Sequence, residues 1–232
     1  MQLSLTQPCS WALLLLLLSN LLLWENVVSV PMCEVINGQC QLTLEYLLNR
    51  ARGLSENTNR LTSEIFNEFD KEHAPVRVSW GKIPLVCYNY SLPVSDSTTQ
   101  EQEIQPEVLL KVTIGMLLGW NHTLRHIAAD MADLKSIPGV GVFISNVRKI
   151  AAKFTRLTRV LQEVKSLLKL VRLEPEEDDD YPASTGFPSL HLLTKPSRLT
   201  VYHAVLGCVN YDAEKIATHV KILRCKMIHK KC

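Results

Sequence analysis

The sequence lacks the local patterns that carry enzyme or metal chemistry. It has no Gly-x-Ser-x-Gly nucleophile elbow, no phosphate-binding loop, and no Ser, His and Asp in a catalytic order. It also has no Cys-x-x-Cys with a matching histidine pair, the spacing typical of structural zinc sites. These absences predict a protein that is not an enzyme and needs neither a cofactor nor a metal ion.

Two further absences concern strands and membrane spans. No segment sustains the two-residue alternation of a half-buried β-strand. The only long apolar run, WALLLLLLSNLLLW at 11–24, has fourteen residues, whereas a membrane-spanning helix needs about 20. This run suits the apolar region of a secretory signal peptide, although no Lys or Arg precedes it. We expect cleavage after Ser29, leaving residues 30–232 as one secreted domain without a membrane span.

The cysteines are the next feature. Of seven, Cys9 lies in the expected signal peptide, and six remain: Cys33, Cys40, Cys87, Cys208, Cys225 and Cys232. An even number in an exported chain predicts that all six are bridged. Six cysteines allow fifteen pairings. Proximity ranks Cys33–Cys40 and Cys225–Cys232 first and leaves Cys87 with Cys208, but it does not exclude the other pairings.

Most of the remaining chain has helical periodicity. Apolar residues recur every three or four positions in four long segments. We expect helices at about 42–69, 106–134, 142–171 and 197–225. The aromatic and methionine side chains in these stripes are interpreted as core. The sequence therefore predicts an all-α fold.

The lengths of the connections predict how the helices are ordered. Residues 135–141 can span only about 23 Å, too little to return along a helix of about 42 Å. The second and third helices are therefore expected to be antiparallel neighbours. The other two connections, 71–105 and 172–196, are long enough to cross the full length. An up-up-down-down four-helix bundle with two long crossovers, the long-chain cytokine arrangement, accounts for them.

Six segments, in order along the chain, give a family resemblance. They are VPMCEVINGQC, SEIFNEFDKEHA, GWNHTLRHI, YPASTGFPSL, SRLTVYHAVLGC and ILRCKMIHKKC. Together they resemble the prolactin family of hormones, and in particular its prolactin-like placental members in rodents. The resemblance implies a secreted hormone, expected as a monomer, that cross-links cytokine-type receptor ectodomains through two faces. It also implies the pairings Cys33–Cys40, Cys87–Cys208 and Cys225–Cys232.

The receptor-binding positions that the resemblance implies differ in part from those of prolactin. Prolactin has histidines on its first helix, and two arginines and a histidine on its fourth. In this chain Glu56 and Asn59 stand at the first-helix positions, and Asn210, Tyr211 and Glu214 stand at the fourth-helix positions, whereas Tyr202, Lys215 and Lys221 match. Losing these cations removes charge-assisted hydrogen bonds, which predicts weak binding to the ordinary prolactin receptor. Glu163 is aligned with a glycine of the second face, so a 1:1 complex is expected.

Other motifs have simpler interpretations. Asn89 in NYS and Asn121 in NHT are N-glycosylation sequons, and we expect both to be used. The acidic run at 174–180 lacks the glycine and the spacing of a calcium loop and is interpreted as a solvated linker. His122 and His126, four residues apart, are interpreted as a surface pair and not as metal ligands.

A basic face on the third expected helix suggests an alternative function. Its cations are Arg148, Lys149, Lys153, Arg156 and Arg159. Such a face attracts polyanions through long-range electrostatics that depend on salt. The alternative function is therefore an extracellular factor that binds heparan sulfate and acts locally without cross-linking receptors. The net charge of +2 gives no indication of a nucleic-acid partner.

Overall fold

The computed structural model describes residues 33–36, 39–72, 104–137, 139–172 and 194–229. These residues divide into two compact units, Met1–Tyr46 and Leu47–Cys232. The expected signal peptide and both expected crossovers lie almost entirely outside the described residues.

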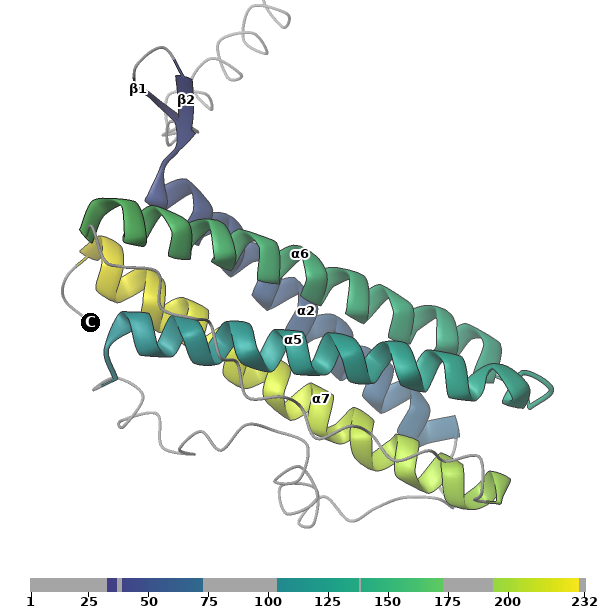
Figure 1. Ribbon diagram of the computed structural model, residues 1–232. Coiled ribbons are helices and arrows are strands. Elements are labelled where there is room, and N and C mark those ends of the chain that lie inside the picture. The colour runs from purple at the N-terminus through teal and green to yellow at the C-terminus, as the bar shows by residue number, and fades with distance from the viewer. Residues whose placement is uncertain (1–32, 37–38, 73–103, 138, 173–193, 230–232) are drawn as a thin grey trace, which may run out of the picture. The chain divides into compact units, whose positions relative to one another are not determined.

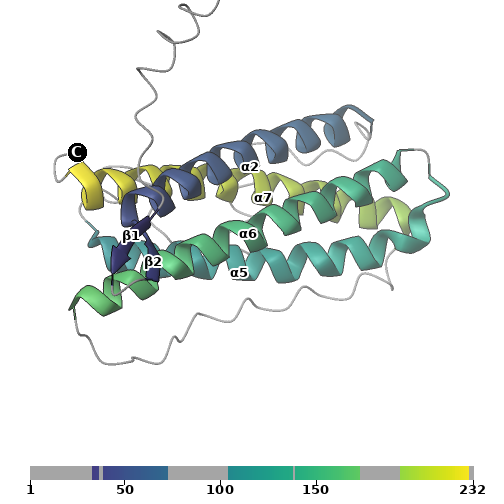
Figure 2. The same ribbon diagram turned by 90° about the horizontal axis from the view of Figure 1, so that it is seen from above.

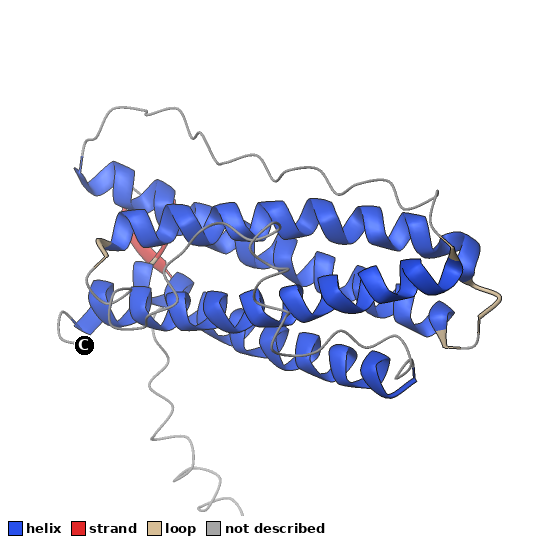
Figure 3. Cartoon of the chain, turned by 90° about the horizontal axis from the view of Figure 1, so that it is seen from below, coloured by secondary structure: helices blue, strands red, loops and turns tan. Residues whose placement is uncertain are grey.

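The N-terminal unit contains a β-hairpin, drawn in red in Figure 3. Strands β1 (Cys33–Ile36) and β2 (Gln39–Leu42) pair antiparallel, with Ile36 opposite Gln39. The prediction that no strand competes with the helices is wrong here. The two residues between the strands are Asn and Gly, the commonest pair in tight hairpin turns. The strands are too short for a period of two to stand out in the sequence.

The second unit is built from four long helices (Figure 1). Helix α2 (Leu44–Glu72) begins in the first unit and continues through the second. Helix α5 (Pro106–Asp130) ends in a 3₁₀ turn, η3 (Met131–Leu134), and α6 (Val140–Arg172) follows. Helix α7 (Lys195–Arg224) ends in one π-helical turn, η4 (Cys225–His229). The four expected helices are therefore confirmed, each starting within a few residues of its predicted position.

Hydrogen bonds between side chains define how neighbouring helices run. Asn121 of α5 donates to Thr155 of α6 at 3.0 Å, and these two helices are joined by a short turn. Figure 1 shows α5 and α6 next to each other, and in the view of Figure 2 α6 crosses in front of α5. Between α5 and α7, Trp120 contacts Asp212 and Thr113 contacts His219. Rising residue numbers on one helix meet falling numbers on the other, so α5 and α7 are antiparallel.

Local sequence accounts for several helix ends. Pro106 occupies the first turn of α5, where its missing N–H costs nothing. The side chain of Thr194 caps α7 by accepting a hydrogen bond from the backbone N–H of Ser197. Gly139, just before α6, has φ of 82°, a conformation that favours glycine. A Cβ at Gly139 would collide with the carboxylate of Glu72 at the end of α2.

The core matches the predicted apolar stripes closely on α7 and less closely on α2. On α7 the apolar residues that recur every three or four positions are buried: Leu199, Tyr202, Val205, Leu206, Val209, Ile216, Val220 and Leu223. On α2, Leu54 and Leu61 are only half-buried, while Ser55 and Thr62 are buried. Each of these two hydroxyls donates to a backbone carbonyl of its own helix, which allows a polar residue to enter the core. Among the described residues, no helix is both long and apolar enough to cross a bilayer.

Candidate functional site

The first predicted receptor-binding face involves α2 and α7, whose contact has a regular antiparallel register. Arg224 donates to Asn49 at 2.6 Å near one end of the pair. Thr62 bonds Asn210 at 3.3 Å in the middle, and His203 bonds Asp70 at 2.9 Å near the other end. These contacts span most of both helices, so residues on their outer sides form one continuous surface.

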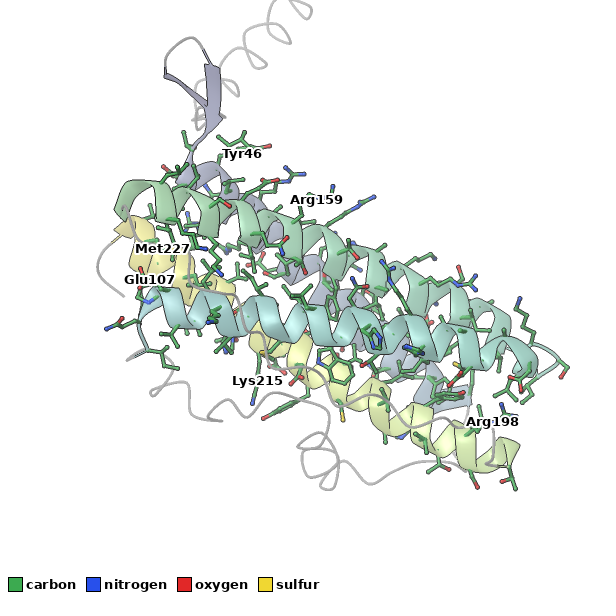
Figure 4. All side chains as sticks on the ribbon, in the orientation of Figure 1. Tyr46, Glu107, Arg159, Arg198, Lys215 and Met227 are labelled. Atoms are coloured by element: carbon green, nitrogen blue, oxygen red, sulfur yellow. The ribbon has the colours of Figure 1, made fainter. Side chains whose placement is uncertain are left out.

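Most of the α7 residues predicted for this face reach the surface. Glu214 and Lys221 are exposed, and Tyr211 and Lys215 are partly exposed. The Lys215 ammonium lies 4.7 Å from the centre of the Tyr211 ring, a cation–π contact. Figure 4 shows Lys215 pointing away from the helices. The structure therefore brings together an aromatic ring, a cation and a carboxylate within one turn of α7.

Tyr202 is a correction to this set. Its side chain has 0% exposure and cannot contact a partner without unpacking the core. Burial raises the pKa of Tyr202 to about 12, and the charge of Asp130 adds to the rise. Nearby, Arg198 donates to Asp133 at 2.8 Å, and this bond raises the pKa of the guanidinium. Tyr202 therefore lies in the core, near the buried Arg198 of α7 and the charged residues at the end of α5, of which Asp133 is exposed.

The two predicted α2 residues have different environments. Glu56 is exposed and accepts a hydrogen bond from Arg52 at 2.7 Å. Asn59 is half-buried. The antiparallel register places Asn59 near the level of Glu214 and Glu56 near that of Ala217. The α2 part of the face thus carries an exposed ion pair, which contributes little to stability and leaves Glu56 accessible.

Sequence reasoning missed two features of this face. Arg60 and Glu64 form a second exposed pair on α2 at 2.5 Å. Asn210, predicted as a receptor contact, is also bonded to Thr62 across the helix interface. The i, i+4 spacing of Arg60 and Glu64 was a readable signal. The link between Thr62 and Asn210 joins residues 148 positions apart, and no local pattern reveals it.

Glu163, the residue predicted for the second face, lies partly against the protein. It is half-buried, and its Oε2 atom is shielded from solvent without a hydrogen-bond partner among the described residues. The side chain therefore does not simply extend outward from α6. Its effect on a second receptor stays a prediction.

Four of the five predicted cations of the basic face are exposed on α6. They are Arg148, Lys149, Arg156 and Arg159, and Figure 4 shows Arg159 extending outward from the helix. The fifth, Lys153, is half-buried and donates to Asn57 of α2 at 3.2 Å. Lys153 thus helps to join two helices and is less available to a ligand than the other four.

Four of the six cysteines expected to form disulfides, Cys33, Cys40, Cys208 and Cys225, lie among the described residues. Cys208 and Cys225 are both disulfide-bonded. They are 17 positions apart along α7 and its last turn, about 25 Å, too far to bond each other. In the hairpin, Cys33 lies opposite Leu42 and Cys40 opposite Val35, so the two cysteines are on paired strands two residues out of register. Cys87, Cys232 and Asn89 lie outside the described residues.

Asn121, the second sequon, lies inside α5. Its side-chain nitrogen, the atom that would carry a glycan, donates to Thr155 of α6. The hydroxyl of Thr123 is also engaged, donating to the carbonyl of Gly119 at 3.1 Å. A glycan at Asn121 would compete with the contact between α5 and α6.

No metal-binding cluster accompanies these faces. Among the described residues, no three His, Cys, Asp or Glu side chains gather in an arrangement that could hold a metal ion.

Comparison with known proteins agrees with this architecture. Residues 16–232 match the model of the somatotropin hormone family. The chain is 38% identical to Prolactin-5A1 of Rattus norvegicus over 94% of its own length and 96% of the relative. It is 37% and 35% identical to Prolactin-2A1 of Rattus norvegicus and of Mus musculus, in both cases over 98% of its own length and 97% of the relative. The chain therefore belongs to the somatotropin/prolactin family, whose members are hormones and not enzymes.

Proposed function

We propose that this hormone is secreted and acts by binding a cytokine-type receptor ectodomain through the outer face of α2 and α7. The observation that carries the proposal is the cluster of Tyr211, Glu214 and Lys215 on α7, together with the accessible Glu56 on the neighbouring α2. Tyrosine is enriched among the central contacts of protein interfaces, and charged side chains such as Lys215 and Glu214 are more typical of the polar rim around them.

Secretion is supported by two features. The apolar run at 11–24 has the length of a signal peptide's apolar region. Cys208 and Cys225 are disulfide-bonded, which fits an oxidising compartment. Within this proposal the three pairings are Cys33–Cys40, Cys87–Cys208 and Cys225–Cys232, and the mature chain begins after Ser29.

The same proposal includes the up-up-down-down order of the helices. It is supported by the antiparallel contacts of α7 with both α2 and α5. If α2 and α5 both run opposite to α7, they run parallel to each other. A long crossover must then join them, and the 33 residues between Glu72 and Pro106 are enough for one.

The proposed receptor is not the ordinary prolactin receptor. Asn210 and Tyr211 stand where prolactin has two arginines. The side chain of Asn210 is bonded to Thr62 within the hormone. Each missing charge-assisted hydrogen bond corresponds to about 1.5–3 kcal/mol. We expect binding to that receptor to be weak, and any complex to contain one receptor per hormone because Glu163 replaces a glycine at the second face.

The direct test uses the mature protein against a set of cytokine-receptor ectodomains on a biosensor. The variant Lys215→Ala is expected to weaken binding to the true receptor by at least about fivefold. Arg156→Ala, on α6, serves as the control and should bind as the wild type does. Equal affinities for all three proteins would reject the face, and a 1:2 complex in sedimentation would reject the predicted stoichiometry.

The second candidate function is binding of heparan sulfate or a similar polyanion by α6. It is favoured by the exposure of Arg148, Lys149, Arg156 and Arg159. The two functions do not exclude each other, because the proposed residues lie on different helices.

A further inference from the structure

His122 and His126 bring two imidazole nitrogens together on the exposed side of α5. Both residues are exposed, and their Nε2 atoms are 3.2 Å apart. The ring centres are 4.4 Å apart, with 55° between the ring planes. The sequence alone gave only the spacing of four residues, which many unrelated surface pairs share. The distance between the two nitrogens is additional structural information.

This separation matches the geometry of a shared metal ion. Zinc–nitrogen bonds are about 2.0–2.1 Å long. An ion bonded equally to two nitrogens 3.2 Å apart would have an N–Zn–N angle of about 100–106°. That angle is close to the tetrahedral value. The separation of the two nitrogens thus suits one shared ion, and both rings are exposed and can turn to direct their lone pairs at it.

A hydrogen bond between the rings is the alternative use of this geometry. With one Nε2 protonated and the other not, the pair makes a single N–H···N bond at the surface, which adds little stability because water competes for both groups. A metal ion instead requires the lone pair of both Nε2 atoms, with the protons on Nδ1. Each ring can adopt that tautomer, since both are exposed and can rotate.

The helix supporting the pair is well anchored. On the opposite side of α5, Leu124 and Ile127 are fully buried, and Asn121 is bonded to α6. Because the backbone is fixed, binding orders only two side chains, which reduces the entropic cost of chelation. One neighbour opposes binding, since Arg125 places a cation on the same side of the helix, where its Nε donates to Asn121 at 3.2 Å.

The chemistry of the ligands limits which ions fit. Imidazole suits zinc, copper and nickel, whereas calcium and magnesium require oxygen ligands. The described residues offer no cluster of three candidate ligands, so two coordination positions would be filled by water. The other histidines with described side chains, His203 and His219, are buried and bonded to Asp70 and Thr113.

We propose that His122 and His126 form a surface site for one divalent transition-metal ion of the zinc class. The site is on α5, outside the proposed receptor-binding face of α2 and α7, and it does not depend on that function.

The test is calorimetric titration of zinc chloride into the purified secreted protein at pH 7.5. Four proteins are compared: the wild type, His122→Gln, His126→Gln and the double variant. Groups that merely support a metal ligand typically contribute about 10–100-fold in affinity. Removing either ligand should therefore lower the affinity for zinc by at least about tenfold. The double variant should bind zinc no more tightly than either single variant. Replacing exposed side chains should leave the helical circular dichroism unchanged.

Arg125→Gln provides the matched control. It alters the same exposed surface but keeps both imidazoles, so it should bind zinc at least as tightly as the wild type. The proposal fails if the double variant binds zinc as tightly as the wild type, because the ion would then be held elsewhere, for example at His73, His191 or His229. It also fails if Arg125→Gln loses binding as completely as the double variant does.

Discussion

Trp120 of α5 donates its indole N–H to the carboxylate of Asp212 of α7, with 2.6 Å between Nε1 and Oδ2, and both residues are buried. A carboxylate in the core is costly unless it is hydrogen-bonded. The bond can form at only one position along the two helices. It therefore specifies which turn of α5 packs against which turn of α7.

The first prediction concerns this buried bond. Asp212→Ala leaves the indole N–H of Trp120 without its acceptor and should lower the free energy of unfolding by about 1–3 kcal/mol. Glu214→Ala, which removes an exposed carboxylate from the same helix, should change it by less than about 0.5 kcal/mol. Urea denaturation provides both values.

The double variant Trp120→Phe with Asp212→Ala separates this bond from general packing. If the bond matters, the double variant should lose less stability than the two single variants together. The role assigned to the bond would be contradicted if the stability loss of the double variant equalled the sum of the two single losses. It would also be contradicted if Asp212→Ala and Glu214→Ala had equal urea midpoints.

The same pair shows how far sequence reasoning reaches. The position of Trp120 in an apolar stripe correctly predicted that it faces the core. Nothing local predicted that Asp212 is buried, because its partner is 92 positions away. On α2, likewise, the predicted stripe included Leu54 and Leu61, which are half-buried, whereas Ser55 and Thr62 enter the core by bonding to their own helix.

The candidate sites divide in a similar way. Helical spacing alone indicates that Tyr211 and Lys215, four apart, share one face of α7. The family resemblance predicted that Tyr202 contacts a receptor and is therefore exposed. The helical spacing of apolar residues on α7 predicted instead that Tyr202 faces the core. The stripe was correct, because a tyrosine among leucines and valines at helical spacing lies on the buried side. The sequence did contain a local signal for the hairpin, the pair Asn37–Gly38. It was not used, because the flanking segments are too short to show a sustained alternation of apolar and polar residues.

The second prediction uses the raised pKa of Tyr202, about 12. An unfolded tyrosine has a pKa near 10. Below pH 10 both states keep the proton. Between about pH 10 and 12 the unfolded chain loses the proton first, so stability falls as pH rises, by up to about 1.4 kcal/mol per pH unit from this residue. Denaturation curves at several alkaline pH values measure the slope.

Tyr202→Phe is the control for that slope. Lysines and other tyrosines also titrate in this range, but phenylalanine removes only the contribution of residue 202. The variant should lose stability less steeply than the wild type above pH 10. Identical slopes would mean that the phenol is not held in its protonated form by the core.

The third prediction compares the two sequons. The Asn121 nitrogen is occupied by its bond to Thr155, and a glycan there would stand at the contact of α5 with α6. We expect lower glycan occupancy at Asn121 than at Asn89 in the secreted protein. Glycopeptide mass spectrometry measures both. Asn89→Gln should shift the mobility of the protein on a gel more than Asn121→Gln does. A larger shift from Asn121→Gln would show the reverse preference.

The last prediction concerns the basic face of α6. If Arg156 and Arg159 bind a polyanion, their joint replacement by glutamine should lower the salt concentration at which the protein elutes from heparin. The matched control is Arg52→Gln with Arg60→Gln, which removes the same net charge from α2. In the wild type these two arginines are paired with Glu56 and Glu64, so much of their charge is already neutralised locally. Long-range attraction depends on the local field as well as the net charge, so the α6 variant should elute at clearly lower salt than the control. Equal shifts in the eluting salt concentration would mean that retention on heparin depends only on net charge. Elution of the wild type near physiological ionic strength would argue against a matrix-binding role.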